Sequence, residues 1–155
     1  MEIKLVNSED IQKWKNLSFE YDKYVKELVS DLTEWYEGGE NSMSFDEYIE
    51  RRINQKEAFM AIDNNDNCLG IVAISYKRNY ITFFGISENM DIEIIGNKLL
   101  HYVFKKLDIN KPISINEIKS KSEWILKHNE LYNKNGFVLN GDTIENGVPV
   151  YVYIK

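Results

Sequence analysis

The chain has 155 residues, of which 43% are hydrophobic, 13% aromatic and 28% charged. This length and composition predict one compact domain over residues 1–155 and exclude an intrinsically disordered chain. The net charge of −6, from 19 Lys and Arg against 25 Asp and Glu, argues against nucleic-acid and anionic-membrane binding, because both partners require basic surfaces. A neutral or cationic partner is favoured.

The single cysteine, Cys68, excludes an intramolecular disulfide and a cysteine-rich metal site. The two histidines, His101 and His128, are too far apart in the sequence to suggest a metal site. The opening residues MEIKLVNSED lack the pattern of a secretion signal, and no stretch has the length and apolarity of a membrane span. We therefore expect a cytoplasmic protein without a bound metal, and a homodimer is left open.

The first third of the chain predicts one strand and two helices. Alternating residues indicate a strand over 2–6, after which Ser8 is a candidate cap for a helix that starts at residue 9. Helical spacing continues to the Gly38-Gly39 stop, with a break near Leu17-Ser18. Ser44 and Glu47 have the spacing of a capping box for the second helix, over 45–54.

The middle of the chain predicts three strands followed by a helix. The strands cover 58–62, 68–76 and 80–86, and the turn-forming residues between them favour an antiparallel meander. Apolar residues then recur at helical spacing from Ile92 to Leu107, which predicts a helix with one buried face.

The last third predicts a strand, a helix and a hairpin. The strand covers 112–118, and Ser122 is a candidate cap for a helix that runs to about residue 135. Strands over 137–144 and 150–154 are joined by Asn146-Gly147, a strong hairpin signal.

This order of elements resembles the GNAT superfamily of acyl-coenzyme A dependent N-acyltransferases along nearly the whole chain. The sharpest local match is LYNKNGF, Leu131–Phe137. It reproduces the last seven positions of the pattern A-x-x-L-Y-x-K-x-G-F, which ends the fourth helix of many members. His128 stands at the alanine position, and Ile125 stands where the family often has asparagine. The resemblance implies an α/β (α+β) fold with a mixed, mostly antiparallel sheet of about six to seven strands, flanked by about four helices.

Tyr132 is the catalytic residue that the resemblance implies. Gly136 is expected to stop the helix in a left-handed conformation and Phe137 to anchor the next strand, so that Tyr132 is held on a rigid last turn. In the family the hydroxyl lies near the thioester sulfur, and a phenol with a pKa of about 10 can protonate the departing thiolate. The alternative is a tyrosine that only packs at a helix–strand junction, with its hydroxyl hydrogen-bonded.

The resemblance also implies a coenzyme pyrophosphate site at the start of the third helix, where backbone N–H groups bind anions. The family pattern Q/R-x-x-G-x-G/A aligns with 91–96, but only Gly96 fits it. Asp91 replaces the Gln or Arg, Ile94 replaces the first glycine, and Glu93 adds a negative charge. Asp91 could instead cap the helix and occupy the amides. The expected coenzyme contacts in this region are Ile94, Ile95, Gly96, Asn97, Lys98 and Lys134.

Residues Phe84, Gly85 and Ile86 are expected to contact the pantetheine arm of the coenzyme. In the family a bulge parts two strands here, and Gly85 is the candidate bulge residue, since glycine inside a strand often marks one. A poorly paired strand end is the alternative. This strand carries no carboxylate, so the general base is left open between Glu117, Glu88 and a water molecule.

The first two helices wall the acceptor cleft in the family. Residues 34–40 combine aromatic and acidic side chains, which suit a cationic amine; they include Glu34, Trp35, Tyr36, Glu37 and Glu40. The sequence therefore predicts acetyl transfer from acetyl-CoA to a primary amine of a small molecule or peptide by direct attack, with Tyr132 as general acid. Two alternatives are a GNAT-fold binding or regulatory module with a degenerate, non-catalytic coenzyme site, and an interaction protein that uses a tyrosine-rich surface.

Overall fold

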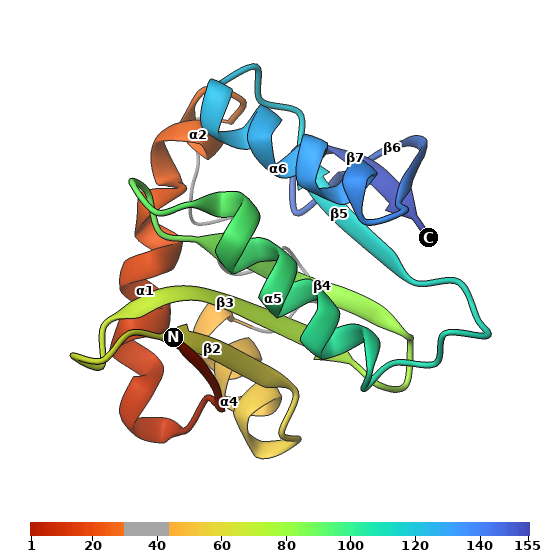
Figure 1. Ribbon diagram of the computed structural model, residues 1–155. Helices are drawn as coiled ribbons and strands as arrows, with labels where there is room; N and C mark the ends of the chain where they lie inside the picture. Colours follow the sequence, from red (N-terminus) through yellow and green to blue (C-terminus); the bar gives the residue numbers. More distant parts are fainter. Residues whose placement is uncertain (30–43) are drawn as a thin grey trace.

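The computed structural model describes residues 1–29 and 44–155, which form a seven-stranded sheet covered by helices (Figure 1). The strands lie in the order β1-β2-β3-β4-β5-β7-β6. Their bounds are β1 (Glu2–Leu5), β2 (Ala58–Ile62), β3 (Cys68–Ser75), β4 (Tyr80–Ile86), β5 (Ser114–Ile118), β6 (Val138–Glu145) and β7 (Val148–Ile154). The helices are α1 (Ile11–Glu20), α2 (Asp22–Lys26), α4 (Phe45–Asn54), α5 (Ile92–Phe104) and α6 (Glu123–Lys134), preceded by a 3-10 turn η1 (Ser8–Asp10). The predicted mixed, mostly antiparallel sheet is confirmed.

The N-terminal helical region differs in two details from the prediction. Asn7, not Ser8, is the cap: its side chain accepts the Glu9 amide at 2.9 Å, and Asp10 completes a capping box. The helix breaks at Tyr21, between α1 and α2, rather than near Leu17-Ser18. The predicted stop at Gly38-Gly39 lies outside the described residues. Ser44 caps α4 as predicted, by accepting the Glu47 amide at 3.2 Å.

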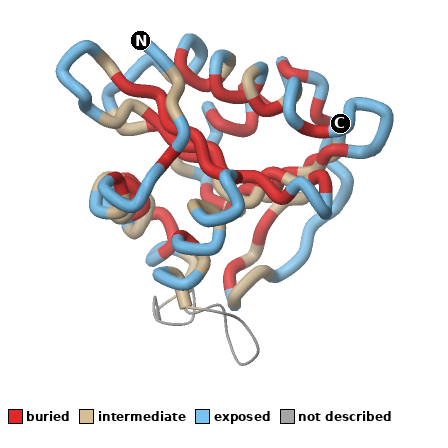
Figure 2. The backbone as a smooth tube through the Cα atoms, turned by 90° about the horizontal axis from the view of Figure 1, so that it is seen from below, coloured by how far each residue is buried: buried red, intermediate tan, exposed pale blue. Residues whose placement is uncertain are grey.

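The two faces of the sheet carry separate cores. Every residue of β2 is buried, and successive side chains alternate between the faces, as the two-residue period of a strand requires. Phe59 packs with α5 and α6, whereas Met60 packs with α1 and α4. Figure 2 shows the buried backbone concentrated in these central strands. The sheet is therefore a rigid layer between two sets of helices.

A bulge in β4 bends the strand next to the site, but not at the predicted residue. Phe83 pairs with Ala73 and Ile81 pairs with Ile74, so Thr82 is the extra residue on β4. Gly85 pairs regularly with Ile71, and its expected role as the bulge residue is therefore wrong. An extra residue bends and twists the strand that carries it. The bend begins directly after Ile81.

Strands β4 and β5 are parallel and part at this bulge. Tyr80 pairs with Ser114 and Ile81 with Ile115, and the register between the two strands stops there. β5 instead stays paired along its whole length with β7. Figure 1 shows β5 leaving β4 and running toward α6. Within the described part of the chain, the backbone of β4 beyond Thr82 thus has no strand partner on its β5 side.

The C-terminal elements follow the prediction with small shifts. α5 ends at Phe104, three residues before the predicted end, because the chain closes into a turn through hydrogen bonds to the carbonyl of Val103. Ser122 precedes α6, but its hydroxyl bonds to Glu27 and does not cap the helix. Gly136 has a φ of +90° and stops α6 as predicted, and the buried Phe137 follows it.

Candidate active site

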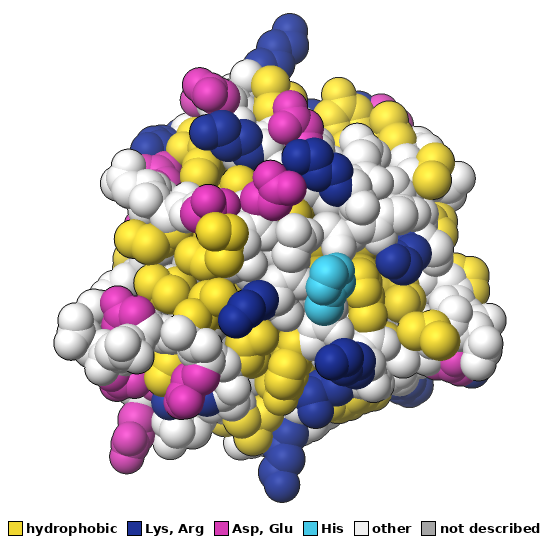
Figure 3. Space-filling view, in the orientation of Figure 1, with side chains coloured by type: hydrophobic (Ala, Val, Ile, Leu, Met, Phe, Trp, Pro, Cys, Tyr) yellow, Lys and Arg dark blue, Asp and Glu magenta, His cyan; other side chains and the backbone are white. Residues whose placement is uncertain are grey.

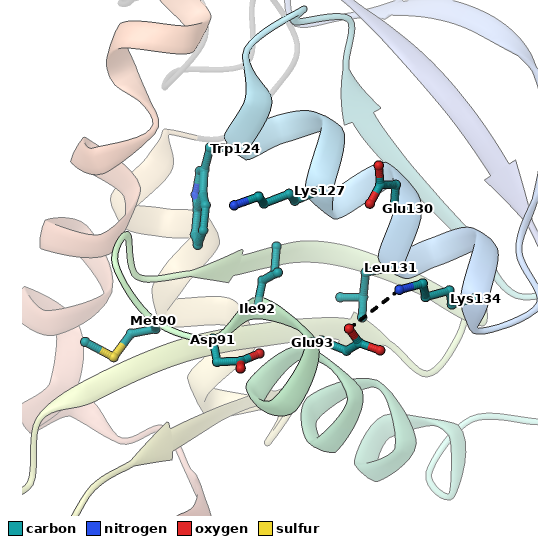
Figure 4. Close-up of a pocket in the computed structure, with 9 residues that line it drawn as sticks. All are labelled: Met90, Asp91, Ile92, Glu93, Trp124, Lys127, Glu130, Leu131 and Lys134. Carbon is teal, nitrogen blue, oxygen red and sulfur yellow. Dashed lines mark ion pairs between the residues drawn. The ribbon is translucent and has the colours of Figure 1, made fainter.

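An open pocket of about 360 Å³ lies between the start of α5 and one face of α6 (Figure 4). Leu131 and Ile92 form its floor, and charged side chains stand around its mouth. The lining residues are Met90, Asp91, Ile92, Glu93, Trp124, Lys127, Glu130, Leu131 and Lys134. We call this space the outer pocket. It lies where the sequence predicted the coenzyme pyrophosphate.

Acidic and basic side chains alternate around the outer pocket. Glu93 and Lys134 form an ion pair of 3.5 Å across it, and both side chains are more than half exposed. Asp91 accepts the amide of Ile94 at 3.0 Å and so caps α5. Figure 3 shows charges of both signs side by side over α6 and the start of α5. The pocket thus offers two lysines to an anion but also presents carboxylates to it.

The other residues predicted to bind the coenzyme on α5 lie away from the outer pocket. Ile94 is 59% exposed, and Ile95 is buried in the core. A Cβ on residue 96 would lie 2.4 Å from the side chain of Leu131, so Gly96 allows α5 and α6 to pack closely. Asn97 accepts a hydrogen bond from Asn135, and Lys98 is exposed. Lys134 alone of the predicted contacts lines the pocket.

The space between the parted ends of β4 and β5, here called the inner gap, is closed by aromatic side chains. Phe84 stands in it with its ring 5.7 Å from that of Tyr132 and 6.0 Å from that of His128. Trp124 packs on His128 at 5.4 Å and also lines the outer pocket. Tyr153 contacts Tyr132 from β7. Trp124 therefore lies between the outer pocket and the aromatic side chains that fill the inner gap.

The hydroxyl of Tyr21 occupies the free backbone edge of β4. The Ser87 amide bonds to the carbonyl of Leu69 on β3, and neighbouring residues of a strand point their backbone groups to opposite sides. The N–H and C=O of Ile86 therefore face β5. Tyr21 Oη accepts that Ile86 N–H at 2.9 Å and lies 3.2 Å from the carbonyl. Gly85 packs against the ring of Tyr21.

His128 holds the hydroxyl of Tyr21 in this position. Its Nδ1 lies 2.8 Å from the Trp124 carbonyl, which can only accept, so Nδ1 carries the proton. Burial lowers the pKa of His128 to about 4, and the neutral ring leaves Nε2 as an acceptor. Tyr21 therefore donates to Nε2 at 2.7 Å. The side chain of His128 is 0% exposed.

Tyr132 faces β5 across the inner gap and is fully buried. Its hydroxyl donates to Glu117 Oε2 at 2.7 Å, and Glu117 Oε1 accepts the Ile118 amide at 3.1 Å. Burial, and then the negative charge of Glu117, raise the pKa of Tyr132 well above its ordinary value. Burial raises the pKa of Glu117 to about 7. A phenol and a carboxyl group are thus paired at the base of the gap.

The remaining candidate groups lie elsewhere or are unreactive. Glu88, a candidate base, accepts the hydroxyl of Tyr24 at 2.6 Å and pairs with Lys23 at 2.7 Å. Burial raises the pKa of the Cys68 thiol to about 12, so it is not a nucleophile at neutral pH. The acceptor residues predicted over 34–40 lie outside the described residues.

Two structural features are absent from residues 1–29 and 44–155. These residues contain no group of three or more His, Cys, Asp or Glu side chains placed to hold a metal ion. In the same two segments no helix has both the length and the apolarity to cross a membrane.

Sequence reasoning missed the role of Tyr21 and the closure of the gap. Tyr21 lies 65 residues before Ile86 and 107 before His128, so no local pattern indicates either contact. One signal was present: a histidine stands at the alanine position of the LYNKNGF pattern. A large side chain there, one turn before Tyr132, indicates a filled rather than an open gap.

The fold matches many known structures, although no model of a protein family and no curated protein sequence matches the chain. A GNAT-family acetyltransferase from Staphylococcus aureus Mu50 superposes with a TM-score of 0.71 at 17% identity, covering 99% of this chain and 97% of that one. An aminoglycoside 6'-acetyltransferase type Ii superposes with a TM-score of 0.61 at 19% identity, covering 100% of this chain and 96% of that one. A spermidine N-acetyltransferase SpeG chimera from Vibrio cholerae and hSSAT superposes with a TM-score of 0.60 at 21% identity, covering 99% of this chain and 95% of that one. The chain has the GNAT acetyltransferase fold.

Proposed function

We propose that this protein is an acetyl-CoA dependent N-acetyltransferase that acetylates a primary amine of a small molecule or peptide. One observation carries the proposal: β4 and β5 part after Ile81 and Ile115, with the outer pocket at one end of the opening and Tyr132 at its base. Trp124 connects the two, because it lines the pocket and packs on His128. A long, thin donor with a polar head fits this layout.

The outer pocket suits the diphosphate of coenzyme A in its donor groups. A helix has no internal acceptors for its first amides, and Asp91 takes only that of Ile94, so those of Ile92 and Glu93 remain for an anion. Lys127 and Lys134 stand opposite on α6. The carboxylates of Asp91, Glu93 and Glu130 oppose an anion, so we expect weak rather than tight binding.

Acetyl-CoA supplies an activated thioester carbonyl to an amine when it is bound. Tyr132 Oη holds the proton that the departing sulfur requires, and its burial keeps water away from that proton. The Ile86 N–H offers a donor on the free edge of β4 once Tyr21 Oη moves away. Phe84 and Phe137 fix the ring of Tyr132 from two sides.

We propose a cationic acceptor in the cytoplasm, and neither a nucleic acid nor a membrane. The net charge of −6 supports a cation, and the single cysteine fits a reducing compartment. Two proteins of the same fold are named for amines that are cationic at neutral pH, an aminoglycoside and spermidine. Both are suitable first acceptors to test.

The test is calorimetry with acetyl-CoA, followed by thiol release with a panel of amines. We expect millimolar or tighter binding and turnover with at least one amine. Tyr132→Phe should lower kcat by about 100-fold or more, with little change in donor affinity, because only the acidic hydroxyl is lost. Tyr102→Phe on α5, which removes a tyrosine hydroxyl away from the inner gap, is the matched control. A Tyr132→Phe rate equal to that of Tyr102→Phe would remove the acid role.

A second candidate is a GNAT-fold binding or regulatory module without catalysis. One observation favours it: Tyr21, His128 and Phe84 fill the inner gap, and Tyr21 already takes the Ile86 amide. This candidate predicts no heat of binding at millimolar acetyl-CoA and no thiol release with any amine. The two functions are therefore separated by the first measurement.

A further inference from the structure

Tyr132 and Glu117 form a buried hydrogen-bonded pair at the base of the inner gap. The hydroxyl donates to Glu117 Oε2 at 2.7 Å, and the two side chains are 0% and 8% exposed. Glu117 Oε1 is held by the Ile118 amide, so the carboxyl group has a fixed orientation toward the phenol. Glu117 comes from β5 and Tyr132 from the last turn of α6. Two rigid elements thus set the contact.

The phenol alone is a poor acid in this surrounding. While Glu117 is ionised, the hydroxyl proton points at the carboxylate, and release of that proton would place two negative charges 2.7 Å apart. Burial first, and then this repulsion from Glu117, raise the pKa of Tyr132 well above its ordinary value. An ordinary thiol has a pKa of about 8.5, so transfer from such a phenol to a thiolate runs uphill. A protonated Glu117 removes both obstacles.

We infer that Glu117 is the proton source behind Tyr132, so that the carboxyl group and the phenol work as a relay to the leaving sulfur. The inference rests on the proposed acetyl transfer. When Glu117 Oε2 carries the proton, it donates to Tyr132 Oη, and the phenolic proton turns toward the gap. Glu117 acts through Tyr132 and is a positioning residue for it.

Protons and bonds balance over each turnover of the relay. The bond from the acyl carbon to sulfur breaks with its electron pair on sulfur, and the bond from the acyl carbon to nitrogen forms. Sulfur gains the proton of Tyr132 Oη, which gains the proton of Glu117 Oε2. The nitrogen loses one proton to water, and Glu117 regains one from water. Tyr132 and Glu117 end as they began.

Glu117 is placed to be protonated near neutral pH. Among residues 1–29 and 44–155, the titratable groups whose charges interact with Glu117 are Tyr132 on α6, Tyr153 on β7, Tyr21 at the α1–α2 junction and Glu145 on β6. None of these is a cation, and Glu145 adds a negative charge that favours the protonated acid. The pKa of about 7 that burial gives Glu117 leaves a large protonated fraction at neutral pH.

The first test observes the carboxyl group without any reaction. The side-chain carboxyl carbon of Glu117, followed by NMR in glutamate-labelled protein, should titrate near pH 7 and be assigned by its absence in Glu117→Gln. In Tyr132→Phe the midpoint should rise, because the hydrogen bond from Tyr132 lowers the pKa of Glu117. A midpoint in the ordinary range of a glutamate, or one that ignores Tyr132→Phe, overturns the inference even if Glu117→Gln fails to fold.

The second test follows kcat against pH with a saturating amine. The wild-type rate should fall about tenfold per pH unit above pH 7, as Glu117 loses its proton. Glu117→Gln should lack this limb and turn over about tenfold more slowly at pH 6.5, with acetyl-CoA binding unchanged. Glu145→Gln, which removes a neighbouring carboxylate but leaves the relay, should keep the limb and shift it to lower pH.

The outcomes separate the two proposals. A limb that persists unchanged in Glu117→Gln overturns the relay and leaves the acetyl transfer standing. A wild-type protein that neither binds acetyl-CoA nor releases thiol overturns the proposed function, and the relay with it. If the fall in kcat above pH 7 is lost in Glu117→Gln but kept in Glu145→Gln, both the relay and the acetyl transfer are supported.

Discussion

The outer pocket and the inner gap share Trp124, yet exposed charged side chains surround the pocket and buried aromatic side chains fill the gap. The outer pocket is open and ringed by exposed charges, such as the Glu93–Lys134 pair. The inner gap is closed by aromatic side chains, and two of its phenols are hydrogen-bonded in pairs, Tyr21 with His128 and Tyr132 with Glu117. The pocket therefore resembles a site ready to receive a ligand, whereas the gap must rearrange to receive one.

The contrast shows where electrostatics has leverage in this molecule. Charges at the outer pocket face water, which screens them and makes each worth little. In the inner gap, burial shifts the pKa of Glu117 upward to about 7 and that of His128 downward to about 4. Changes in the gap should therefore alter stability and pH dependence, and changes in the pocket should alter only binding. Substitutions in the two regions test this division between the gap and the pocket.

The largest effect is a pair of opposed pH dependences within the inner gap. A raised carboxyl pKa stabilises the fold fully below about pH 4.5, and this contribution is lost as the pH rises through about 7. A lowered imidazole pKa stabilises the fold fully above about pH 6.5, and this is lost as the pH falls through about 4. Each shift is worth about 3 kcal/mol. In the wild type the loss of stability from Glu117 and the gain from His128 nearly cancel as the pH rises from about 4.5 to 6.5.

Single substitutions should expose these slopes in urea unfolding. The unfolding free energy of the wild type minus that of Glu117→Gln should decrease by about 3 kcal/mol from pH 4.5 to 7. The unfolding free energy of the wild type minus that of His128→Gln should increase by about 3 kcal/mol from pH 4 to 6.5. The double variant controls for coupling and should match the sum. Parallel curves for wild type and both single variants would show that the gap is wet, and the contrast with the outer pocket would fail.

A smaller effect is expected from the hydroxyl that closes the gap. Tyr21→Phe keeps the ring but frees the Ile86 N–H and His128 Nε2. If a donor competes for the Ile86 amide, acetyl-CoA should bind about three- to tenfold more tightly by calorimetry, the equivalent of one net hydrogen bond. Tyr24→Phe removes a hydroxyl that bonds to Glu88 instead, and serves as the control. Equal affinities in the two variants would mean that Tyr21 does not obstruct the donor.

Local patterns predicted the fold well because its signals are local. The bounds of β2, β4 and α4 agree with the sequence, since a cap, a hydrophobic period and a turn lie within a few residues of each element. Gly136 was placed correctly because a helix stop of this kind requires a positive φ. The end of α5 was missed because the apolar spacing continues to Leu107, which is buried but no longer helical.

The site was predicted less completely because its contacts span the chain. The position of Tyr132 follows from LYNKNGF, but its partner Glu117 lies on a different element, and the sequence offered it only as one of three bases. The bulge at Thr82 depends on how β3 pairs with β4, so the position of a glycine in the strand wrongly indicated Gly85 as the bulge residue. Asp91 was expected, as one alternative, to cap α5, and it does. Long-range register and side-chain filling cannot be derived from local patterns.

The smallest effect is expected at the rim of the outer pocket. Glu93→Gln releases Lys134 from its ion pair and removes one carboxylate that faces the diphosphate. Acetyl-CoA should then bind about twofold more tightly, a change typical of an exposed, screened charge, whereas Lys134→Gln should weaken binding by a similar factor. Both effects should vanish in about 1 M salt, where the screening length is about 3 Å. Acetyl-pantetheine, which lacks the phosphates, should bind all three proteins equally. An effect that survives high salt or extends to acetyl-pantetheine would place Glu93 in the closed part of the site and not at its screened rim.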